Sequence, residues 1–109
     1  MHDVSFLGQS NLYHSLQLAQ QDARKSAINN LLHYLVSDLN FHVPRHKKLL
    51  NIQLMRQLAT ETWFTDVGDY KYGKKYRCYI VITLTESDIH KIAIASGIRK
   101  VASQKTQAV

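Results

Sequence analysis

The residue types that could do chemistry in this chain are one cysteine, six histidines and eight carboxylates. Cys78 lies among basic residues, and nearby positive charge lowers the pKa of a thiol and activates it as a nucleophile. The strand pattern around it, however, points Cys78 to the opposite face from Arg77, and free cysteine is among the most often buried residue types. We therefore expect Cys78 to be a small core residue. A single cysteine also excludes an internal disulfide and a cysteine-based zinc site.

His42 and His46 form a pair with a metal-ligand spacing. Side chains four residues apart lie on one face of a helix, where two histidines could hold a metal ion. Pro44 stands between them and disfavours that helix, because proline has no backbone N–H to donate. We expect both histidines to be solvated or capping residues, without a metal.

The carboxylates show no catalytic arrangement either. We expect Asp69 in a turn and Asp88 at a helix start, so they would converge with Asp66 or Glu86 only by accident of the fold. The sequence contains no GxGxxG, P-loop or HExxH motif. It therefore predicts a protein that is not an enzyme and has no cofactor.

A different kind of site is indicated by the segment TWFTDVGDYKYGKKYRCYIVITLTESD, residues 62–88. It interleaves tyrosines with lysines and an arginine, and exposed aromatic rings can stack on bases while cations neutralise phosphates. The alternative is an ordinary hairpin, with Tyr76 and Cys78 facing the core and solvated lysines at the tip, where they discourage pairing with other strands. In that interpretation only Tyr79 lies beside Arg77 on the outer face. We favour the hairpin interpretation.

The candidate partner-binding residues fall in two basic clusters. One belongs to the hairpin and the other to the connector FHVPRHKK, residues 41–48, whose charges are most simply solvated. The net charge of +6 favours an anionic partner, which could be nucleic acid, an acidic protein surface or lipid headgroups. The candidates are Arg45, Lys47, Lys48, Lys71, Tyr72, Lys74, Lys75, Arg77 and Tyr79.

The totals fit one self-sufficient domain spanning residues 1–109. Hydrophobic residues make up 45% and charged residues 20%, so a packed core is expected. A chain of this size buries roughly 65% of the surface that its unfolded form exposes. It shows no export signal and no apolar run long enough to span a membrane. We expect residues 1–11 and 98–109 to be flexible ends.

An amphipathic helix is expected between residues 12 and 40, which contain neither glycine nor proline. Three alanines in its apolar seam would let the helix axis approach a sheet or another helix closely. The helix should end before Pro44, because the residue preceding proline is pushed out of helical space. The apolar positions recur at steps of three or four and are Leu16, Ala19, Ala23, Ala27, Leu31 and Tyr34, widened by Ile28, Leu32, Leu35 and Leu39.

Residues 49–59 fit either a strand or a helix. Leu50, Ile52 and Leu54 alternate with polar residues as in a strand, whereas Leu50, Leu54 and Leu58 have helical spacing. We favour a strand, which could continue through residues 60–67.

A β-hairpin follows, with strands at residues 60–67 and 76–84 and a turn from Gly68 to Gly73. The inward positions of its second strand are Tyr76, Cys78, Ile80, Ile82 and Leu84.

A second, shorter helix is expected after the hairpin. Thr85 or Ser87 should accept a backbone bond at its start, and Gly97 should end it. Its buried face comprises Ile89, Ile92, Ala93 and Ser96.

These features resemble a bacterial family of small lipoprotein domains that includes the N-terminal domain of the flagellar assembly protein T. The resemblance spans about residues 15–93 and rests on three features. They are the helix motif AxxDARxxAxxNLL (Ala19, Asp22, Ala23, Arg24, Ala27, Asn30, Leu31, Leu32), Trp63 at the start of the hairpin, and YRCYIVITLTESDI, Tyr76 to Ile89. It implies a long helix packed on an antiparallel sheet, and a non-catalytic role in cell-envelope or flagellar assemblies. This chain departs from the family in lacking an export signal and a lipidated cysteine.

The strand KKYRCYIVITL also resembles the central strand of the RNA-recognition motif. It lacks the glycine expected between the aromatic residues, and that fold begins with a strand, whereas a long helix is the first element expected here.

Taken together, the sequence predicts an α+β domain. A long N-terminal and a shorter C-terminal helix pack on a small antiparallel sheet built around a β-hairpin. The expected function is a non-catalytic protein-interaction or structural domain of a bacterial cell-envelope, secretion or motility assembly, with a protein partner or a second copy bound. Its location would be the periplasm or envelope if the resemblance holds and a signal was removed, and otherwise the cytoplasm. The alternative is a small nucleic-acid-binding module that uses the Tyr/Lys-rich hairpin.

Overall fold

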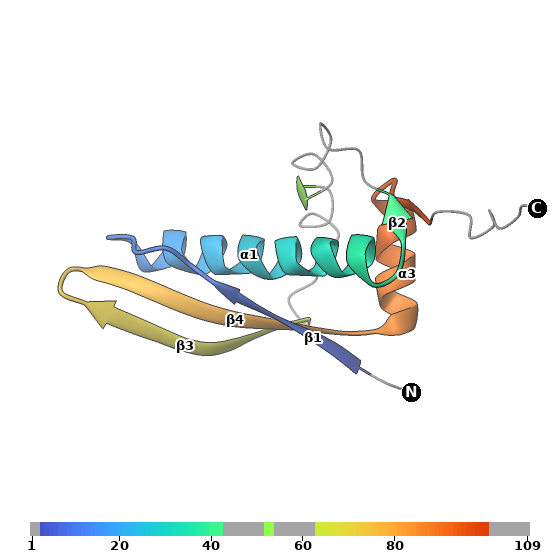
Figure 1. The fold of residues 1–109 in the computed structure, drawn as a ribbon. Coiled ribbons are helices and arrows are strands. Elements are labelled where there is room, and N and C mark those ends of the chain that lie inside the picture. The colour runs from blue at the N-terminus through green and yellow to red at the C-terminus, as the bar shows by residue number, and fades with distance from the viewer. Residues whose placement is uncertain (1–2, 43–51, 54–62, 101–109) are drawn as a thin grey trace, which may run out of the picture.

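The computed structural model describes residues 3–42, 52–53 and 63–100 (Figure 1). Two helices and a three-stranded antiparallel sheet make up most of this part of the chain, and two short strands pair with each other beside them. The elements are β1 (Asp3–Gln9), α1 (Leu16–Ser37), β2 (Phe41–His42), β3 (Phe64–Tyr72), β4 (Lys75–Thr85), α3 (Glu86–Ala95) and β5 (Arg99–Lys100).

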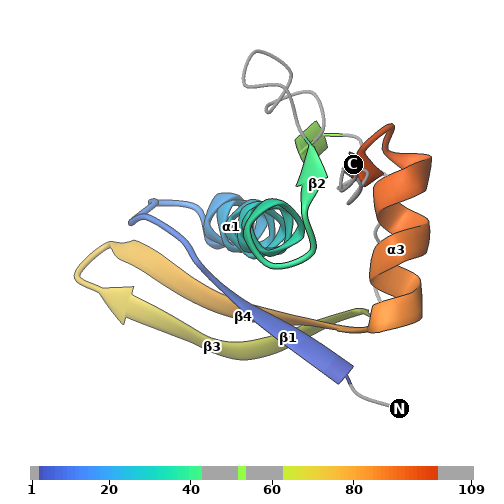
Figure 2. The ribbon, with the colours of Figure 1, turned by 45° about the vertical axis from the view of Figure 1, so that its right-hand side comes forward.

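β4 is the central strand of the sheet, with β1 and β3 antiparallel on either side. α1 lies along one face and contacts β4 and β1, and α3 stands at the end of β4 (Figures 1 and 2). The predicted α+β class, with a long and a shorter helix and a sheet built around a hairpin, is confirmed. Apart from the short strands, the order strand, helix, strand, strand, helix with the last strand in the centre is that of a split β-α-β unit.

The first strand was not foreseen. Residues 3–9 pair with β4 along their whole length, and Phe6 is buried, so the prediction of a flexible end over residues 1–11 is wrong for this stretch. The expectation that a helix is the first element is wrong for the same reason. At the other end Ile98 is buried and Arg99–Lys100 form β5, so the predicted flexible end does not begin at residue 98. Residues 101–109 lie outside the described residues.

α1 and β1 approach each other unusually closely. Ala19, Ala23 and Ala27 are fully buried, as the alanine seam predicts. Their partner is Gly8 of β1, where a Cβ atom would lie 2.5 Å from the backbone nitrogen of Ala27 and would also meet the carbonyl oxygen of Ala23. The helix therefore rests directly on the strand backbone at this point.

The core lies between α1 and the sheet. Cys78, Ile80, Ile82 and Leu84 of β4 are buried and Tyr76 is partly buried, which confirms the predicted inward face. Most of the predicted helix stripe is buried as well. The exceptions are Leu16, which is exposed, and Tyr34 and Leu39, which pack on the core while only partly buried.

The hairpin turn is tighter than the sequence suggested. β3 extends to Tyr72, which pairs with Lys75, so the turn consists of Gly73 and Lys74 alone. Gly73 has φ +63°, the conformation that two-residue hairpin turns require at their first position. Gly68 instead lies in β3, at a shift in register that follows Asp66.

The ambiguous segment is described at two positions. Ile52 and Gln53 are helical, so the favoured strand is wrong there, and the rest of residues 49–59 lies outside the described residues. Trp63, directly before β3, has a 3₁₀-helical conformation, where the sequence had predicted strand.

α3 begins where the sequence indicated. The hydroxyl of Thr85 accepts a hydrogen bond from the backbone N–H of Asp88 at 3.1 Å, so Thr85 rather than Ser87 caps the helix. Ile89, Ile92, Ala93 and Ser96 are buried, and Gly97 with φ +80° follows the last turn. In the described part of the chain, neither helix is long and apolar enough to cross a lipid bilayer.

Ser10 extends the pairing of β1 with β4 beyond the regular strand. Its hydroxyl accepts a hydrogen bond from the backbone N–H of Cys78 at 2.8 Å and donates one to the carbonyl of Asn11 at 2.7 Å, and the residue is buried. Ser10→Ala leaves the buried N–H of Cys78 without this acceptor. We expect the free energy of unfolding to fall by about 1–3 kcal/mol, measured by urea denaturation.

The matched control is Ser5→Ala. Ser5 is exposed and bonds Thr83 at the surface, so its loss should change the free energy of unfolding by less than about 0.5–1 kcal/mol. Equal losses for the two variants would contradict the role given to Ser10.

Candidate functional site

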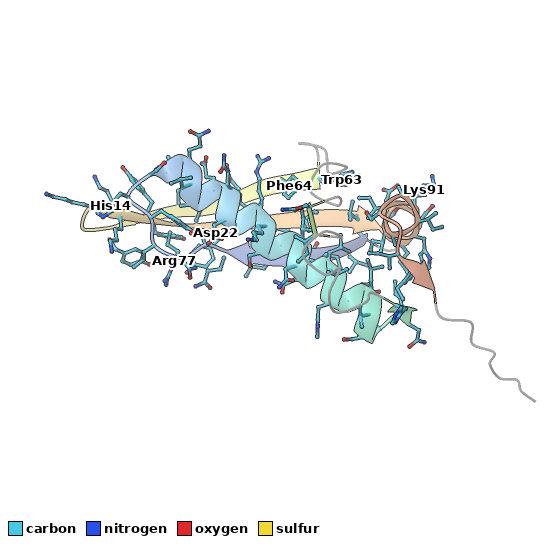
Figure 3. All side chains as sticks on the ribbon, turned by 90° about the horizontal axis from the view of Figure 1, so that it is seen from above. His14, Asp22, Trp63, Phe64, Arg77 and Lys91 are labelled. Carbon is cyan, nitrogen blue, oxygen red and sulfur yellow. The ribbon has the colours of Figure 1, made fainter. Side chains whose placement is uncertain are left out.

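The side chains that could act as acids, bases or metal ligands are dispersed. In Figure 3, His14 and Asp22 lie near the end of the sheet that carries the hairpin turn, whereas Lys91 lies on α3 at the opposite end. Within the described residues, no three His, Cys, Asp or Glu side chains gather into a metal-binding group. His42 is exposed in β2, and His46 lies outside the described residues.

Cys78 is a buried core residue, as predicted. Burial raises the pKa of its thiol to about 12, and the carboxylate of Asp69, with Asp66 beyond it, adds to this rise. A thiol that stays protonated at neutral pH is a poor nucleophile.

The raised pKa of Cys78 makes stability depend on alkaline pH. The unfolded thiol ionises near the ordinary value of 9.0, whereas the folded thiol stays neutral up to about 12. Unfolding therefore releases a proton in this window, and stability is lost as the pH rises from about 9 towards 12. We expect the urea midpoint of Cys78→Ala to fall less steeply than that of the wild type between pH 8 and about pH 10.5. Since the tyrosines titrate in both proteins, parallel curves would contradict this assignment.

Asp22 organises the connection between β1 and α1. Its carboxylate accepts a hydrogen bond from the backbone N–H of Asn11 at 2.8 Å, and it bonds the hydroxyl of Tyr13, whose pKa is raised by burial and by Asp22. Asp22 also borders an open hollow with Lys25, Ser26 and Asn29. Asp22 and Ser26 each accept a hydrogen bond from a backbone N–H, that of Asn11 and that of Gln9, so both side chains already help to join β1 to α1.

The face of the sheet turned away from α1 is covered by no element of the described part of the chain. Both helices and the two short strands lie on the other side or at the end of the sheet (Figures 1 and 2). By the register of the three strands, this outer face comprises Asp3, Ser5, Leu7, Gln9, Thr65, Gly68, Tyr70, Tyr72, Lys75, Arg77, Tyr79, Val81, Thr83 and Thr85. Leu7, Tyr70 and Tyr72 are 51%, 50% and 53% exposed, so the face presents large apolar and aromatic side chains to solvent.

Three tyrosines share this outer face. Tyr70 and Tyr79 make an edge-to-face contact with ring centroids 5.6 Å apart. The ring of Tyr70 folds back over Gly68, where a Cβ would lie 2.7 Å from the ring. The absence of a side chain at Gly68 therefore allows the two rings to pack at the centre of the face. Tyr72 extends the aromatic surface towards the turn.

The predicted binding residues of the hairpin are divided between two faces. Tyr72, Lys75, Arg77 and Tyr79 lie on the outer face, Lys74 lies in the turn, and Lys71 lies on the opposite face, with its ammonium 5.6 Å from the ring centroid of Tyr76. The prediction that only Tyr79 lies beside Arg77 is wrong, because the longer β3 brings Tyr70 opposite Arg77 and Tyr72 opposite Lys75. Arg45, Lys47 and Lys48 lie outside the described residues.

The two edges of the sheet differ. At β1, the side chain of Asn30 donates a hydrogen bond to the carbonyl of Leu7 at 2.6 Å, and the hydroxyl of Ser26 accepts one from the N–H of Gln9 at 3.2 Å. α1 thus occupies backbone groups that a further strand would need. β3 has no described element beside its outer edge along residues 69–72 (Figure 2).

The backbone groups at the edge of β3 can be assigned from the ladder. Tyr76 exchanges both of its backbone hydrogen bonds with Tyr13, and Cys78 bonds Ser10 on the same side. In β3, Lys71 lies opposite Tyr76 and Asp69 lies opposite Cys78. Each of these two pairs is therefore a non-hydrogen-bonded pair of the β3–β4 ladder. The backbone N–H and C=O groups of Lys71 and Asp69 therefore point away from β4, towards the open edge of the sheet. Within the described residues they bond no other backbone group.

Comparison with known proteins does not identify a function for this surface. No family model, no curated protein and no solved structure matches the chain. The similarity to the small lipoprotein domain family stays a prediction, and so does the function that it implies.

The outer face was only partly visible in the sequence. Leu7 was missed because residues 1–11 were expected to be a flexible end, and because Leu7 itself interrupts the alternation of Val4 and Phe6 with Ser5. Tyr70 belongs to the Tyr/Lys-rich hairpin but is not among the candidate partner-binding residues, because the sequence predicts that the turn begins at Gly68. The signal for the true turn was Gly73, which stands between two strongly β-prone runs.

Proposed function

We propose that this chain is a non-catalytic protein-interaction and structural domain, and that its outer sheet face and the open edge of β3 bind a protein. The bacterial envelope, secretion or motility setting of this proposal is supported by the family resemblance of the sequence. The observation that carries the proposal is a sheet with one face packed under α1 and the other face covered by no described element, displaying Leu7, Tyr70 and Tyr72 at about half exposure.

The chemistry of the outer face supports a protein partner. Protein interfaces are enriched in tyrosine and arginine at their centres. Tyrosine in particular buries a large area at a low cost in conformational entropy. Val67, at the register shift of β3, is 55% exposed and adds a further exposed apolar side chain to this strand. Tyr70 and Tyr79 already hold each other in place, so little ordering is needed when a partner binds.

Site-specific photo-crosslinking tests this proposal in cells that express the full chain. A benzoylphenylalanine side chain replaces Tyr72 on the outer face, and in the control it replaces Ile94, which is 70% exposed on α3. We expect a discrete, light-dependent product that contains protein from position 72 and none from position 94. Absence of a product at position 72, or the same products at both positions, would refute the proposal.

A nucleic-acid-binding function is the second candidate. The observation in its favour is that Tyr70, Tyr72, Tyr79 and Arg77 share one uncovered face, and the chain carries a net charge of +6. Three features favour the protein-binding function over it. Tyr70 and Tyr79 pack edge to face, so their rings are partly used by each other. Arg77 is half-buried, and its Nε has no hydrogen-bond partner among the described residues. Lys71 projects from the opposite face.

Salt dependence separates the two candidates. We expect at most weak binding of labelled single- and double-stranded DNA and RNA at about 50 mM salt, and loss of this binding at about 200 mM. The reason is that the outer face carries few cations that could neutralise phosphates and release their condensed counterions. Binding that persists at the higher salt, and that Tyr79→Ala weakens more than Ile94→Ala does, would establish the nucleic-acid function instead.

A further inference from the structure

We propose that the partner at the open edge of β3 is a second copy of this chain, paired antiparallel through residues 68–72 about a two-fold axis at Tyr70. This inference rests on the proposed function and names the partner of the same surface. The pairing joins two three-stranded sheets into one and places the two outer faces side by side.

The ladder limits how two β3 strands can pair. Asp69 and Lys71 carry the outward N–H and C=O groups, so an antiparallel partner must place its own outward residues opposite them. Three antiparallel registers place outward residues opposite each other and still pair most of residues 68–72. Their axes pass through Asp69, Tyr70 or Lys71.

Charge selects one of these registers. An axis at Asp69 sets two carboxylates directly opposite each other, and an axis at Lys71 sets two ammonium groups opposite each other, which destabilises both arrangements. An axis at Tyr70 sets Asp69 opposite the partner's Lys71 and Lys71 opposite the partner's Asp69. Each of these two pairs also exchanges two backbone hydrogen bonds.

The outer face agrees with the register at Tyr70. The two copies of Tyr70 meet at the axis as a non-hydrogen-bonded pair, where side chains approach most closely, and both are half exposed in the single chain. Gly68 lies opposite the partner's Tyr72, so a residue without a side chain faces a large ring. Lysine and a register shift normally protect an edge from indiscriminate pairing. Here the same charges favour one partner strand, that of another copy.

The test uses two charge reversals, Asp69→Lys and Lys71→Asp, in sedimentation equilibrium from about 10 µM to about 1 mM. The contact is small, so association belongs to the weak, concentration-dependent class. We expect the mass of the wild type to rise towards twice 12.6 kDa and each single variant to stay monomeric. An equimolar mixture of the two variants should associate again, because position 69 of each chain then faces the opposite charge at position 71 of the other. Far-ultraviolet circular dichroism checks that each variant is folded.

A cysteine pair tests the axis directly and does not depend on the charge variants folding. Tyr70→Cys places two thiols across the axis within the distance that a disulfide spans, whereas Tyr72→Cys faces the partner's Gly68. With oxidised glutathione as the oxidant, we expect a disulfide-linked dimer at least tenfold faster for Tyr70→Cys than for Tyr72→Cys. Cys78 is buried in both.

The results distinguish this inference from the proposed function. A wild type that stays monomeric to 1 mM, or single variants that associate like the wild type, would overturn the self-pairing. If the photo-crosslink at position 72 then contains a different protein, the proposed function stands with another occupant of the edge. If no crosslink forms either, both proposals are wrong.

Discussion

Gly8→Ala is expected to lower the free energy of unfolding by at least about 3 kcal/mol, above the usual range for an added methyl group. A Cβ at this position would lie 2.5 Å from the backbone nitrogen of Ala27 and would also meet the carbonyl oxygen of Ala23. Both atoms belong to the α1 backbone, which cannot swing aside as a side chain can. α1 and β1 must separate, and the contact that holds Phe6, Ala23 and Ala27 in the core is lost.

Urea and thermal denaturation measure this effect. For a domain of this size, 3 kcal/mol corresponds to a fall in Tm of at least about 10 °C. The control is Ile94→Ala on α3, where the truncated side chain is 70% exposed and loses little packing. Its cost should stay below about 1 kcal/mol. If Gly8→Ala were as mild as this control, the close approach of α1 to β1 would be wrong.

The same contact explains how far the sequence could predict the fold. The spacing of Ala19, Ala23 and Ala27 indicated a helix that approaches another element closely, and this is confirmed. The identity of that element was not predictable from the helix. Gly8 stands in a short segment in which an apolar residue, Leu7, points outward, so apolar and polar residues do not alternate regularly. The pairing of this segment with β4 joins residues about 75 positions apart in the sequence. Local sequence patterns carry little information about such pairings.

The candidate surface was predictable to a similar degree. Alternation in β4 correctly separated Cys78 and Ile80 from Arg77 and Tyr79. It could not place Tyr70 and Tyr72, because their face depends on the register shift in β3, and a shift of one residue moves every later side chain to the other face. The two glycines of the hairpin looked alike in the sequence. Only the ladder distinguishes Gly68 within the strand from Gly73 in the turn.

Ile82→Ala provides the second large effect, an expected loss of about 2–5 kcal/mol in the free energy of unfolding. Ile82 is fully buried in the central strand, between Phe6 of β1 and Phe64 of β3. Truncation leaves a cavity in the layer between α1 and the sheet, where neighbouring strands and the helix limit collapse. Urea denaturation at constant pH measures the loss.

Leu7→Ala is the matched control, and it connects stability with the proposed function. Leu7 lies next to Phe6 in β1 but points to the outer face and is 51% exposed. We expect its truncation to change the free energy of unfolding by no more than about 0.5 kcal/mol, whereas a loss comparable with that of Ile82→Ala would mean that the outer face is covered by the chain itself. A small loss for Leu7→Ala would show that folding gains little from this exposed apolar side chain, as the proposed binding surface requires. The pair of variants therefore tests whether the outer face is available to a partner without identifying that partner first.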